Sequence, residues 1–501
     1  MAKLMCMKGP NGLCPCRTCK IIGIRAREGG NNTHYVPYFW DSEPYNPFNL
    51  LLRTHDEFIA DALAVESAPS KAEAERRAKE TGINGLPILA SLSSLKFPHS
   101  FGHDLMHLIS ENVIKNLLSF WIGEYKGLDA GVEEYELAPE VVEEIGKECA
   151  VAGDTTPAAF GARIPNIATK RHYFTAKSYT LWTTMLAPVL LRGRFSHPKY
   201  YRHFLKLVNI FNDCLSMSLE RDYVDRDLCR QIAVWVQEYK MYYYQYEDAR
   251  LSTCPLTIHA LLHIPDDILN GGPMWCYWNY VTECYVGFLV RSSKSRRNPY
   301  ASFARRLHEL TQNTAIKILT FVFCGHEQPG LYPTLFGKLL ANIYRTRITS
   351  LPTSQWQQFP RRLSTGVGSL SSAVGTRCAV LRSPDVDINA HHSRQPRKDE
   401  RQAAYGQLLE LLEFIVVLPE SDINKPLLLA SIRPVKVPKR SPYPFPVYQD
   451  GKFNPIEVVD ADDLSCLVAR IPANRAGPRV YALYERPGAM GASVGAAPNT
   501  E

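Results

Sequence analysis

The chain has 501 residues, of which 45% are hydrophobic and 21% are charged. These proportions are typical of folded proteins and argue against a disordered chain, a collagen or a coiled-coil rod. Lysine and arginine number 57 against 50 acidic residues, and the net charge of +7 favours polyanionic partners only weakly. At about 150 residues per domain, the length predicts two to four folded units.

The cysteines favour an intracellular protein. Their number, 13, is odd, and the first residues contain no long apolar segment before a small-residue cleavage site. Both observations argue against a secreted disulfide scaffold, so we expect reduced thiols. No uninterrupted apolar run approaches the ~20 residues that a membrane-spanning helix needs, and we expect no membrane partner.

The first clear helix is predicted over residues 71–81. Ser70 and Glu73 form a capping-box pattern at the start of the helix-forming run KAEAERRAKET, and Gly82 supplies a stop. After Pro98 the pattern becomes that of amphipathic helices, with Asp104 as a candidate N-cap. Apolar residues then recur at three- and four-residue spacings on one face, at Leu105, Leu108, Ile109, Val113, Leu117 and Trp121.

Two long helices are predicted over residues 200–219 and 224–250, and the second ends in the run YKMYYYQYEDARL. Tyrosines at helical spacing are more often core residues than a stacking platform for bases, so we favour core packing. From residue 255 a short helix carries HALLH and a Gly-Gly-Pro break follows at residues 271–273. A third helix then passes through Trp278, Glu283 and Leu289.

The last part of the chain differs in character. Residues from about 350 to 402 lack periodicity and are rich in Ser, Gly, Arg and Pro, which predicts a flexible basic linker. Short β-branched and aromatic runs then alternate with Pro, Gly and Asp, which is typical of a small β-rich unit. The predicted fold class is therefore mainly α with a small β-rich C-terminal unit.

Two residue pairs are candidate halves of a metal site. Cys16 and Cys19 form a CxxC, whose thiolates can bind one tetrahedral ion, and no βαβ context favours a thioredoxin-like function instead. His259 and His263 lie four residues apart, so on a helix their imidazoles converge. Each half alone is a weak signal, and HxxxH is more often a pair of core histidines. Together they would form a closed Cys₂His₂ site with structural Zn²⁺, tying the start of the chain to its middle.

Several ordered motifs carry a family resemblance. They are CPCRTC followed by HYVP, FPHSFGHDLMHLISENV, LAPVLLRGRF, YYYQYEDARLSTCPLTIHALLHI and GGPMWCYWNYVTECYVGFLVRSSKSRRNP. Over roughly residues 14 to 310 the chain resembles the CACTA (En/Spm-type) transposases, particularly their fungal branch. The resemblance implies a cut-and-paste DNA transposase with an RNase H-like core that a large helical insertion interrupts.

The resemblance also assigns residues. In this superfamily a CxxC, the insertion, an HxxxH-type pair and the catalytic Glu follow in order, which implies Cys16, Cys19, His259 and His263 as zinc ligands and Glu283 as a catalytic acid. Mg²⁺ is expected only in intact members, where three carboxylates hold two ions for phosphodiester displacement. Without the family context, Glu283 would be an ordinary surface or capping residue.

Two departures from the family bear on activity. The second catalytic acid should lie some twenty residues before the CxxC, whereas only fifteen residues precede Cys16 and none is acidic. Cys284 also stands where the family commonly has Arg. We therefore expect the C-terminal portion of a transposase, lacking the first two catalytic acids and without independent nuclease or strand-transfer activity. The alternative is a non-catalytic DNA-binding or regulatory protein derived from a transposase.

Two further groups are candidate functional residues. Asp104, His107 and Glu111 match a family signature and share one helix face; we favour a cap or buried polar network over a second metal or DNA contact. A basic run follows the Glu283 helix, comprising Arg291, Lys294, Arg296 and Arg297. Such a run predicts contacts with the phosphates of transposon ends, against the alternative of a solvated face.

The resemblance and the motifs together predict the organisation and setting of the protein. We expect a nuclear protein, with a second copy or a full-length transposase as a further partner. The predicted units are a zinc knuckle ending the first part of the catalytic core (1–40), the helical insertion (41–254), the zinc-His helix with the Glu283 helix and basic segment (255–345), the flexible linker (346–402), the β-rich unit (403–486) and a disordered tail (487–501).

Overall fold

The computed structural model describes most of the first 324 residues and the strands near the C-terminus. The described residues are 1–25, 33–37, 45–126, 128, 131, 133–154, 156, 160–161, 163–292, 297–324, 361–362, 379–382, 385–387, 399–401, 404–417, 424–438, 445–460, 464–473 and 477–485. The predicted tail and most of the predicted linker lie outside them. No helix in the described part is long and apolar enough to cross a membrane.

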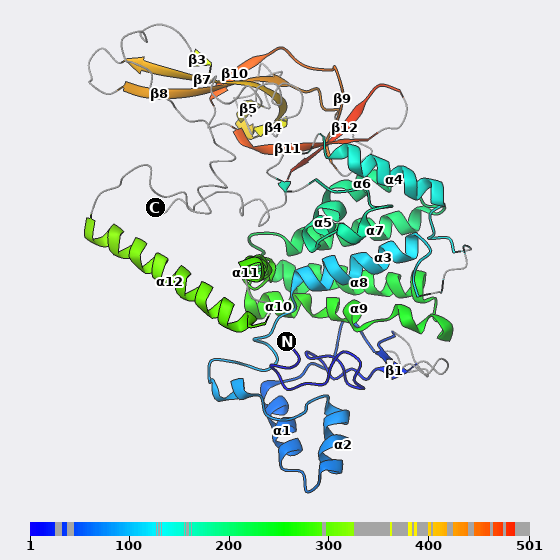
Figure 1. Ribbon diagram of the computed structural model, residues 1–501. Coiled ribbons are helices and arrows are strands. Elements are labelled where there is room, and N and C mark those ends of the chain that lie inside the picture. The colour runs from blue at the N-terminus through cyan, green and yellow to red at the C-terminus, as the bar shows by residue number, and fades with distance from the viewer. Residues whose placement is uncertain are drawn as a thin grey trace.

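A small unit at the N-terminus lies below the helical body in Figure 1. Its elements are β1 (Ile24–Arg25), β2 (His34–Tyr35), α1 (His55–Glu66), α2 (Lys71–Thr81) and a 3₁₀ turn (Ile88–Ser91). The predicted helix 71–81 is confirmed: the Ser70 side chain accepts a hydrogen bond from the Glu73 N–H, and Gly82 ends the helix at φ 78°. The Glu73 carboxylate pairs with Arg76 and Arg77.

The helical body forms the centre of the molecule (Figure 1). Its α-helices are α3 (Ile114–Trp121), α4 (Pro139–Ala152), α5 (Ala176–Leu181), α6 (Ala187–Leu190), α7 (Pro198–Cys214), α8 (Cys229–Tyr239), α9 (Leu256–Ala260) and α10 (Ile264–Gly271). π-Helical segments span Met106–Val113, Trp182–Leu186, Tyr223–Leu228 and Lys240–Tyr244, and 3₁₀ turns span Arg171–Tyr173, Asp248–Thr253, Leu261–His263 and Met274–Cys276. The six residues of the apolar face predicted after Asp104 are each at most 6% exposed.

The tyrosine-rich run is a packing element. Tyr239, Tyr243 and Tyr244 are at most 2% exposed, and the Tyr243 hydroxyl accepts a hydrogen bond from the Trp121 indole at 3.0 Å. Core packing is therefore confirmed over a stacking platform for these three rings. The helix predicted to reach residue 250 ends at Tyr244, because Gln245 and Tyr246 adopt left-handed backbone conformations with φ of 57° and 59°.

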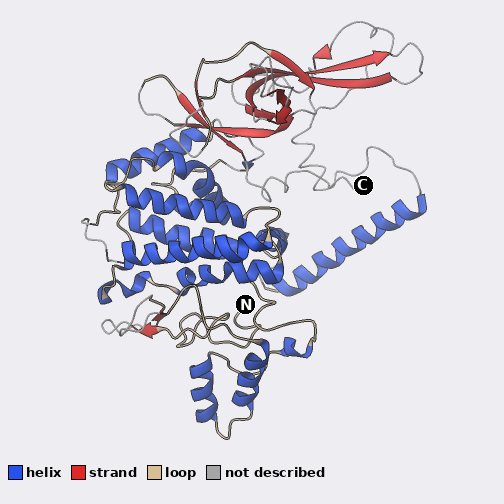
Figure 2. Cartoon of the chain, turned by 180° about the vertical axis from the view of Figure 1, so that it is seen from behind, coloured by secondary structure: helices blue, strands red, loops and turns tan. Residues whose placement is uncertain are grey.

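Two further helices leave the helical body. They are α11 (Tyr280–Ser292), which carries Glu283, and α12 (Pro299–Cys324). Figures 1 and 2 show α12 projecting away from the rest of the molecule. Gly272 ends α10 at φ 82° and so forms the break predicted before the third helix.

An antiparallel sheet lies on the opposite side of the helical body from the N-terminal unit (Figure 2). Its strands run in the order β10 (Glu457–Asp460), β8 (Asn424–Pro434), β7 (Ala404–Val417), β4 (Ala379–Arg382), β11 (Leu464–Pro472), β12 (Val480–Glu485) and β9 (Val447–Gln449), with β3 (Arg361–Arg362) also on β7. A separate two-stranded sheet pairs β5 (Asp385–Asp387) with β6 (Asp399–Arg401). The buried Ala469, Ile471 and Tyr484 join the core of the helices.

The fold class is confirmed as mainly α with a small β-rich C-terminal unit. One boundary differs from the prediction, because β4 comes from the segment predicted as linker and pairs with both β7 and β11. The short run AVLR combines an apolar stretch with a β-branched residue, which suits a strand inside a sheet. The sheet therefore includes residues that precede position 403.

Candidate metal centre

The CxxC loop has the backbone geometry of a metal-binding knuckle. The N–H groups of Thr18 and Cys19 both point at the Cys16 sulfur, at 3.4 Å each. Cys16 and Cys19 are 1% and 2% exposed. Backbone donors directed at a sulfur favour its thiolate form, which is the form that binds metals.

Arg53 fastens this knuckle to the chain that follows it. Its Nε atom donates to the carbonyl oxygens of Cys16 and Cys19 at 3.3 and 3.2 Å, and its Nη2 donates to the Thr81 carbonyl at 2.7 Å. Nη2 also lies 3.1 Å from the Cys14 sulfur. Arg53 is only 2% exposed, so one buried guanidinium holds the loop in place by satisfying its carbonyls.

The two histidines come from a segment more than 200 residues after the knuckle. His259 belongs to α9 and His263 to the 3₁₀ turn that follows, so the single short helix predicted here is α-helical only in its first part. Their Nε2 atoms nevertheless lie 3.3 Å apart, and neither residue is exposed. The change of helix type preserves the convergence that the spacing predicts.

The four side chains meet at one point. The Cys16 sulfur lies 3.3 Å from His263 Nε2, the Cys19 sulfur lies 3.1 Å from His259 Nε2, and all four ligand atoms lie within 4.8 Å of one another. A tetrahedral Zn²⁺ with bonds of about 2.3 Å to sulfur and 2.0 Å to nitrogen places its ligand atoms about 3.3–3.8 Å apart. The cluster has the donor atoms, the spacing and the burial to hold a metal ion.

The pKa shifts favour the metal-binding form at two of the four ligands, Cys16 and His259. Burial acts to raise the pKa of Cys16, but hydrogen bonding to Cys19 and the charge of His263 outweigh it and lower that pKa well below its usual value. The hydrogen bond to Cys16 and burial raise the pKa of Cys19. Burial lowers the pKa of His259 to about 4, which keeps its imidazole neutral and able to bind a cation. Burial acts to lower the pKa of His263, but the charge of Cys16 outweighs it and raises that pKa to about 9.

A carboxylate and a third histidine lie behind His263. Asp266 Oδ2 lies 3.8 Å from His263 Nδ1, and the His263 ring stacks on His103 with centroids 6.1 Å apart. The backbone N–H of His103 donates to Asp267 Oδ2 at 2.9 Å, and Nδ1 of its ring lies 2.7 Å from the same oxygen. Carboxylates behind ligating histidines usually fix their orientation by accepting a hydrogen bond, whereas Asp266 lies within ion-pair distance of His263 but beyond hydrogen-bond distance.

A second group of polar side chains, Asp104, His107 and Glu283, lies outside the Cys–His cluster. Asp104 Oδ2 accepts the His107 N–H at 2.9 Å and lies 2.5 Å from His107 Nδ1, while Oδ1 accepts the Asn279 N–H at 2.6 Å. The other ring nitrogen, Nε2, faces Glu283 Oε1 at 4.0 Å. Asp104 is thus the predicted cap, and it also joins its helix to the start of α11.

Glu111 lies near Tyr280, the first residue of α11. Burial raises the pKa of Tyr280, and the charge of Glu111 is among the smaller contributions in the same direction. The Tyr280 hydroxyl hydrogen-bonds Thr180 Oγ1 at 2.6 Å, and Thr180 in turn bonds Ser110 Oγ at 2.8 Å. This polar network packs the start of α11 against the helical body.

The basic run is only partly described. Arg291 and Arg297 are exposed, whereas Lys294 and Arg296 lie outside the described residues. Three residues beside the Cys–His cluster are not among those predicted from the sequence, namely Arg53, His103 and Asp267. Their only local signal is that His103 immediately precedes Asp104 in a motif already singled out.

The Cys–His cluster is the strongest candidate site in the molecule. Within the described ranges it is the one group of three or more His, Cys, Asp or Glu side chains whose ligand atoms lie close enough to hold a metal ion. No family model, curated protein or solved structure matches the chain. The case for a function therefore depends on the geometry of this cluster and on the chemistry around Glu283.

Proposed function

We propose that this chain is a transposase-derived, DNA-binding protein of the CACTA type, with part of an RNase H-like core and a structural Zn²⁺ ion. The observation that carries the proposal is that four buried side chains lie in contact although they are far apart in the sequence. Cys19 contacts His259, 240 residues away, and Cys16 contacts His263, 247 residues away. The resemblance implies this pairing of distant motifs, and chance core packing gives no reason for four metal-binding side chains to converge.

Zinc is the ion that best fits the donor set. Two thiols and two imidazoles in a tetrahedral arrangement are the common ligands of structural zinc, whereas Mg²⁺ and Ca²⁺ prefer oxygen. The four residues are at most 2% exposed. Four protein ligands would complete the coordination of a tetrahedral ion and leave no position for water or substrate. The ion would tie the N-terminal unit to the helical body.

Glu283 fits the role of a DNA-facing acid, but among the described residues it has no partners for two-metal chemistry. Its side chain is 55% exposed, and no cluster of three acids forms around it in the part of the chain that the structure describes. Two-metal phosphodiester chemistry needs several carboxylates around both ions. This favours the non-catalytic alternative, in which the protein binds DNA or regulates a full-length transposase.

The first experiment measures DNA binding by the full chain as a function of salt. Phosphate contacts through Arg291, Lys294, Arg296 and Arg297 predict affinity that falls steeply with salt, and each contact removed lowers the log–log slope by about 1. Arg296→Ala with Arg297→Ala should therefore lower both affinity and slope. The control is Arg76→Ala, which removes an exposed arginine of α2. An unchanged slope in the double variant contradicts DNA contact through this run.

The second experiment tests catalysis directly. Terminal-repeat DNA incubated with the full chain and Mg²⁺ or Mn²⁺ should remain uncut. Metal analysis of the same preparation shows whether the protein carries its zinc, so that a misfolded sample is not mistaken for an inactive one. Specific nicking that Glu283→Gln abolishes contradicts the non-catalytic alternative.

A further inference from the structure

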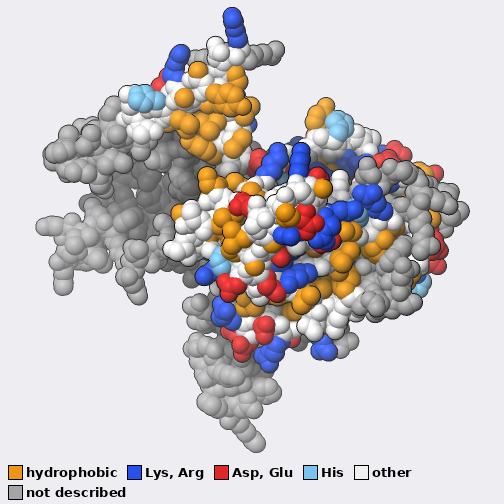
Figure 3. Space-filling model, turned by 90° about the horizontal axis from the view of Figure 1, so that it is seen from below, with side chains coloured by type: hydrophobic (Ala, Val, Ile, Leu, Met, Phe, Trp, Pro, Cys, Tyr) orange, Lys and Arg blue, Asp and Glu red, His pale blue; other side chains and the backbone are white. Residues whose placement is uncertain are grey.

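Helix α11 carries Glu283 and Arg291, yet little of it packs against the helical body. None of its described side chains is buried, and Val281 and Val290 are 72% and 58% exposed. Figure 3 shows hydrophobic side chains gathered at the surface on the part of the molecule that carries α11 and α12. A helix of 13 residues gains little stability by itself, so the position of α11 depends on the few contacts that join it to the helical body.

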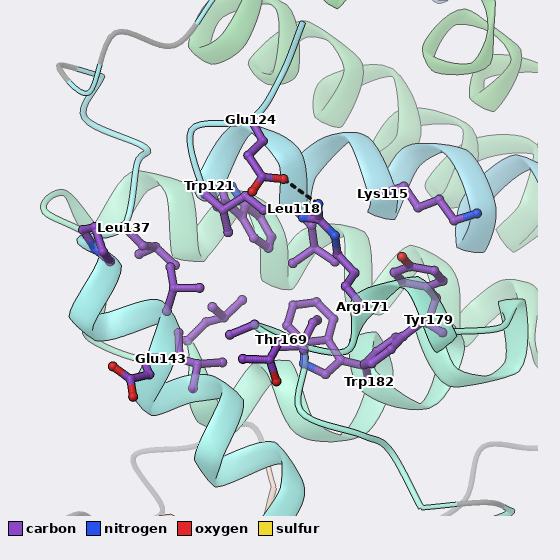
Figure 4. Close-up of a pocket in the computed structure, with 18 of the residues that line it drawn as sticks. Lys115, Leu118, Trp121, Glu124, Leu137, Glu143, Thr169, Arg171, Tyr179 and Trp182 are labelled. Carbon is purple, nitrogen blue, oxygen red and sulfur yellow. Dashed lines mark hydrogen bonds and ion pairs between the residues drawn. The ribbon is translucent and has the colours of Figure 1, made fainter. Parts of the chain in front are cut away.

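The cavity in the helical body does not hold α11. It measures about 670 Å³, and Figure 4 shows side chains of α3, of α4 and of the segment before α5 around it. Residues 280–292 contribute nothing to its lining. Tyr280 instead reaches α5, where its hydroxyl lies 2.6 Å from Thr180 Oγ1. The contacts that hold α11 therefore lie at its first residue and in the turn before it.

The ring of Tyr277, three residues before α11, lies between two glycines. A Cβ atom at Gly102 would lie 3.0 Å from Cε2 of this ring, and one at Gly271 would lie 3.1 Å from Cε1 on its opposite edge. Both distances are shorter than nearly all real Cβ contacts, so a larger residue at either position would displace the ring. Gly102 lies just before the segment that starts at Met106, whereas Gly271 is the last residue of α10. The ring thus fits between two separate parts of the chain.

Asp104 holds the same turn at a second point. Its Oδ1 atom accepts a hydrogen bond from the N–H of Asn279, the residue directly before α11, at 2.6 Å. Gly102 and Asp104 are two residues apart, so one short segment contacts the turn at both Tyr277 and Asn279. Two contacts fix the direction in which α11 leaves the helical body, whereas a single contact would leave the helix free to pivot.

The segment 102–104 is itself fixed on two sides. Arg17, which lies between the two cysteine ligands, donates from Nη2 to the Gly102 carbonyl at 2.8 Å. The N–H of His103 donates to the carboxylate of Asp267 in α10 at 2.9 Å, and Asp267 is only 7% exposed. A shift of this segment would break contacts with the knuckle and with α10, so the segment is a firm base for the turn that precedes α11.

We propose that Tyr277, held between Gly102 and Gly271, positions α11 and so sets how Glu283 and Arg291 face a DNA partner. The part that concerns DNA rests on the proposed function. The ring acts by packing, because in the part of the chain that the structure describes its hydroxyl is buried without a hydrogen-bond partner. Tyr277 and Gly102 are positioning residues.

Hydrogen exchange of the zinc-loaded full chain, followed by mass spectrometry without DNA, tests the proposal. Tyr277→Ala removes the ring, and Gly102→Ala places a methyl group against it. We expect the amides of α11 to exchange about 10-fold faster or more in both variants, since lost aromatic packing or overpacking changes an opening equilibrium by at least that factor. Peptides from α7 and α8 should keep the parental rate, which also establishes that each variant is folded.

Three control variants separate positioning from general damage. Tyr277→Phe keeps the ring and removes only the unpartnered hydroxyl, so α11 should exchange at the parental rate. Tyr173→Ala removes a tyrosine that is 67% exposed, and Gly9→Ala adds a methyl group where no atom lies within 4 Å. Neither change should alter the exchange of α11.

Three results would overturn the proposal. They are parental exchange of α11 in both Tyr277→Ala and Gly102→Ala, equal acceleration of α7, α8 and α11, and acceleration in Tyr277→Phe as large as in Tyr277→Ala. The salt dependence of DNA binding by the same variants is a separate measurement. If the parent does not bind DNA, the proposed function fails while the role of Tyr277 in positioning α11 stands on the exchange data.

Discussion

The Cys–His cluster differs from the Glu283 region, which comprises Asp104, His107 and Glu283. The two differ in burial and in the contacts that position their side chains. The cluster ligands are at most 2% exposed, while the side chains of His107 and Glu283 are 45% and 55% exposed. The cluster joins elements more than 200 residues apart, with Arg53 fixing the backbone beneath it. The Asp104 carboxylate and the Tyr280 hydroxyl anchor the start of α11, while the Glu283 side chain itself faces solvent.

This difference separates two kinds of site. A closed group of four ligands contributes to folding, because the metal is bound by the folded chain and not by the unfolded one. An open pair such as His107 and Glu283 contributes little to stability, since exposed ion pairs are worth about 0–1 kcal/mol. Residues in the first region should therefore govern the melting temperature, and those in the second should govern interactions with other molecules.

Removal of the metal ligands should have the largest effect. We expect the parent to hold about one equivalent of zinc and Cys16→Ser or His263→Ala to lose it, with a fall in melting temperature of roughly 10 °C or more, as structural zinc contributes its binding energy to folding. A strong chelator should destabilise the parent in the same direction. Metal analysis and thermal unfolding measure the two outcomes.

A matched control for the metal prediction is Cys284→Ser, which changes an exposed thiol of α11 that is not part of the cluster. It should retain both the zinc and the parental melting temperature. The comparison fails if Cys16→Ser keeps a full equivalent of metal, or if the metal is lost with no effect on unfolding.

Arg53→Met should have the second largest effect. The substitution keeps much of the aliphatic volume but removes the donors that satisfy the carbonyls of Cys16, Cys19 and Thr81. Buried carbonyls left without partners cost about 1–3 kcal/mol each, so we expect a loss of roughly 3 kcal/mol in unfolding free energy and weaker retention of zinc. Chemical denaturation with a metal-competition titration measures both.

The control for Arg53 is Arg77→Met, because Arg77 also donates to a backbone carbonyl, that of Ala64, but is partly exposed on α2 and lies outside the knuckle. Its zinc affinity should equal that of the parent. Equal zinc affinity in Arg53→Met would show that the knuckle keeps its shape without the buried guanidinium.

The sequence predicted local features better than distant ones. The helix caps at Ser70 and Asp104 and the apolar face from Leu105 to Trp121 follow from residue spacing alone, and all three are observed. The end of the tyrosine-rich helix was missed, because two non-glycine residues adopt left-handed conformations there. Arg53 was missed because nothing in its neighbourhood shows that a cationic side chain will turn inward to cap carbonyls 34 and 37 residues away.

For the candidate site, too, local features were easier to predict than distant contacts. The spacing within CxxC and HxxxH predicts each half of the cluster, since a turn or a helix brings each pair together. Joining the halves required the family resemblance, because no local rule relates positions 16 and 259. The approach of Asp104 and His107 to Glu283 depends on how α11 docks on the helical body, through the Asn279 N–H, and helical periodicity carries no information about that docking.

The smallest predicted effects are on the unfolding free energy, and they should distinguish the role of Asp104 from that of Glu283. Asp104→Ala removes the acceptor for the His107 and Asn279 N–H groups and should cost about 1–2 kcal/mol of unfolding free energy, as the loss of a helix cap typically does. Glu283→Gln keeps the shape of an exposed side chain and should leave the unfolding midpoint unchanged. Denaturant unfolding compares the two, with Asp104→Asn as the conservative variant that should recover most of the loss. If Glu283→Gln destabilises the protein as much as Asp104→Ala does, Glu283 is a structural residue of the helical body, and the contrast between the closed cluster and an open Glu283 region no longer holds.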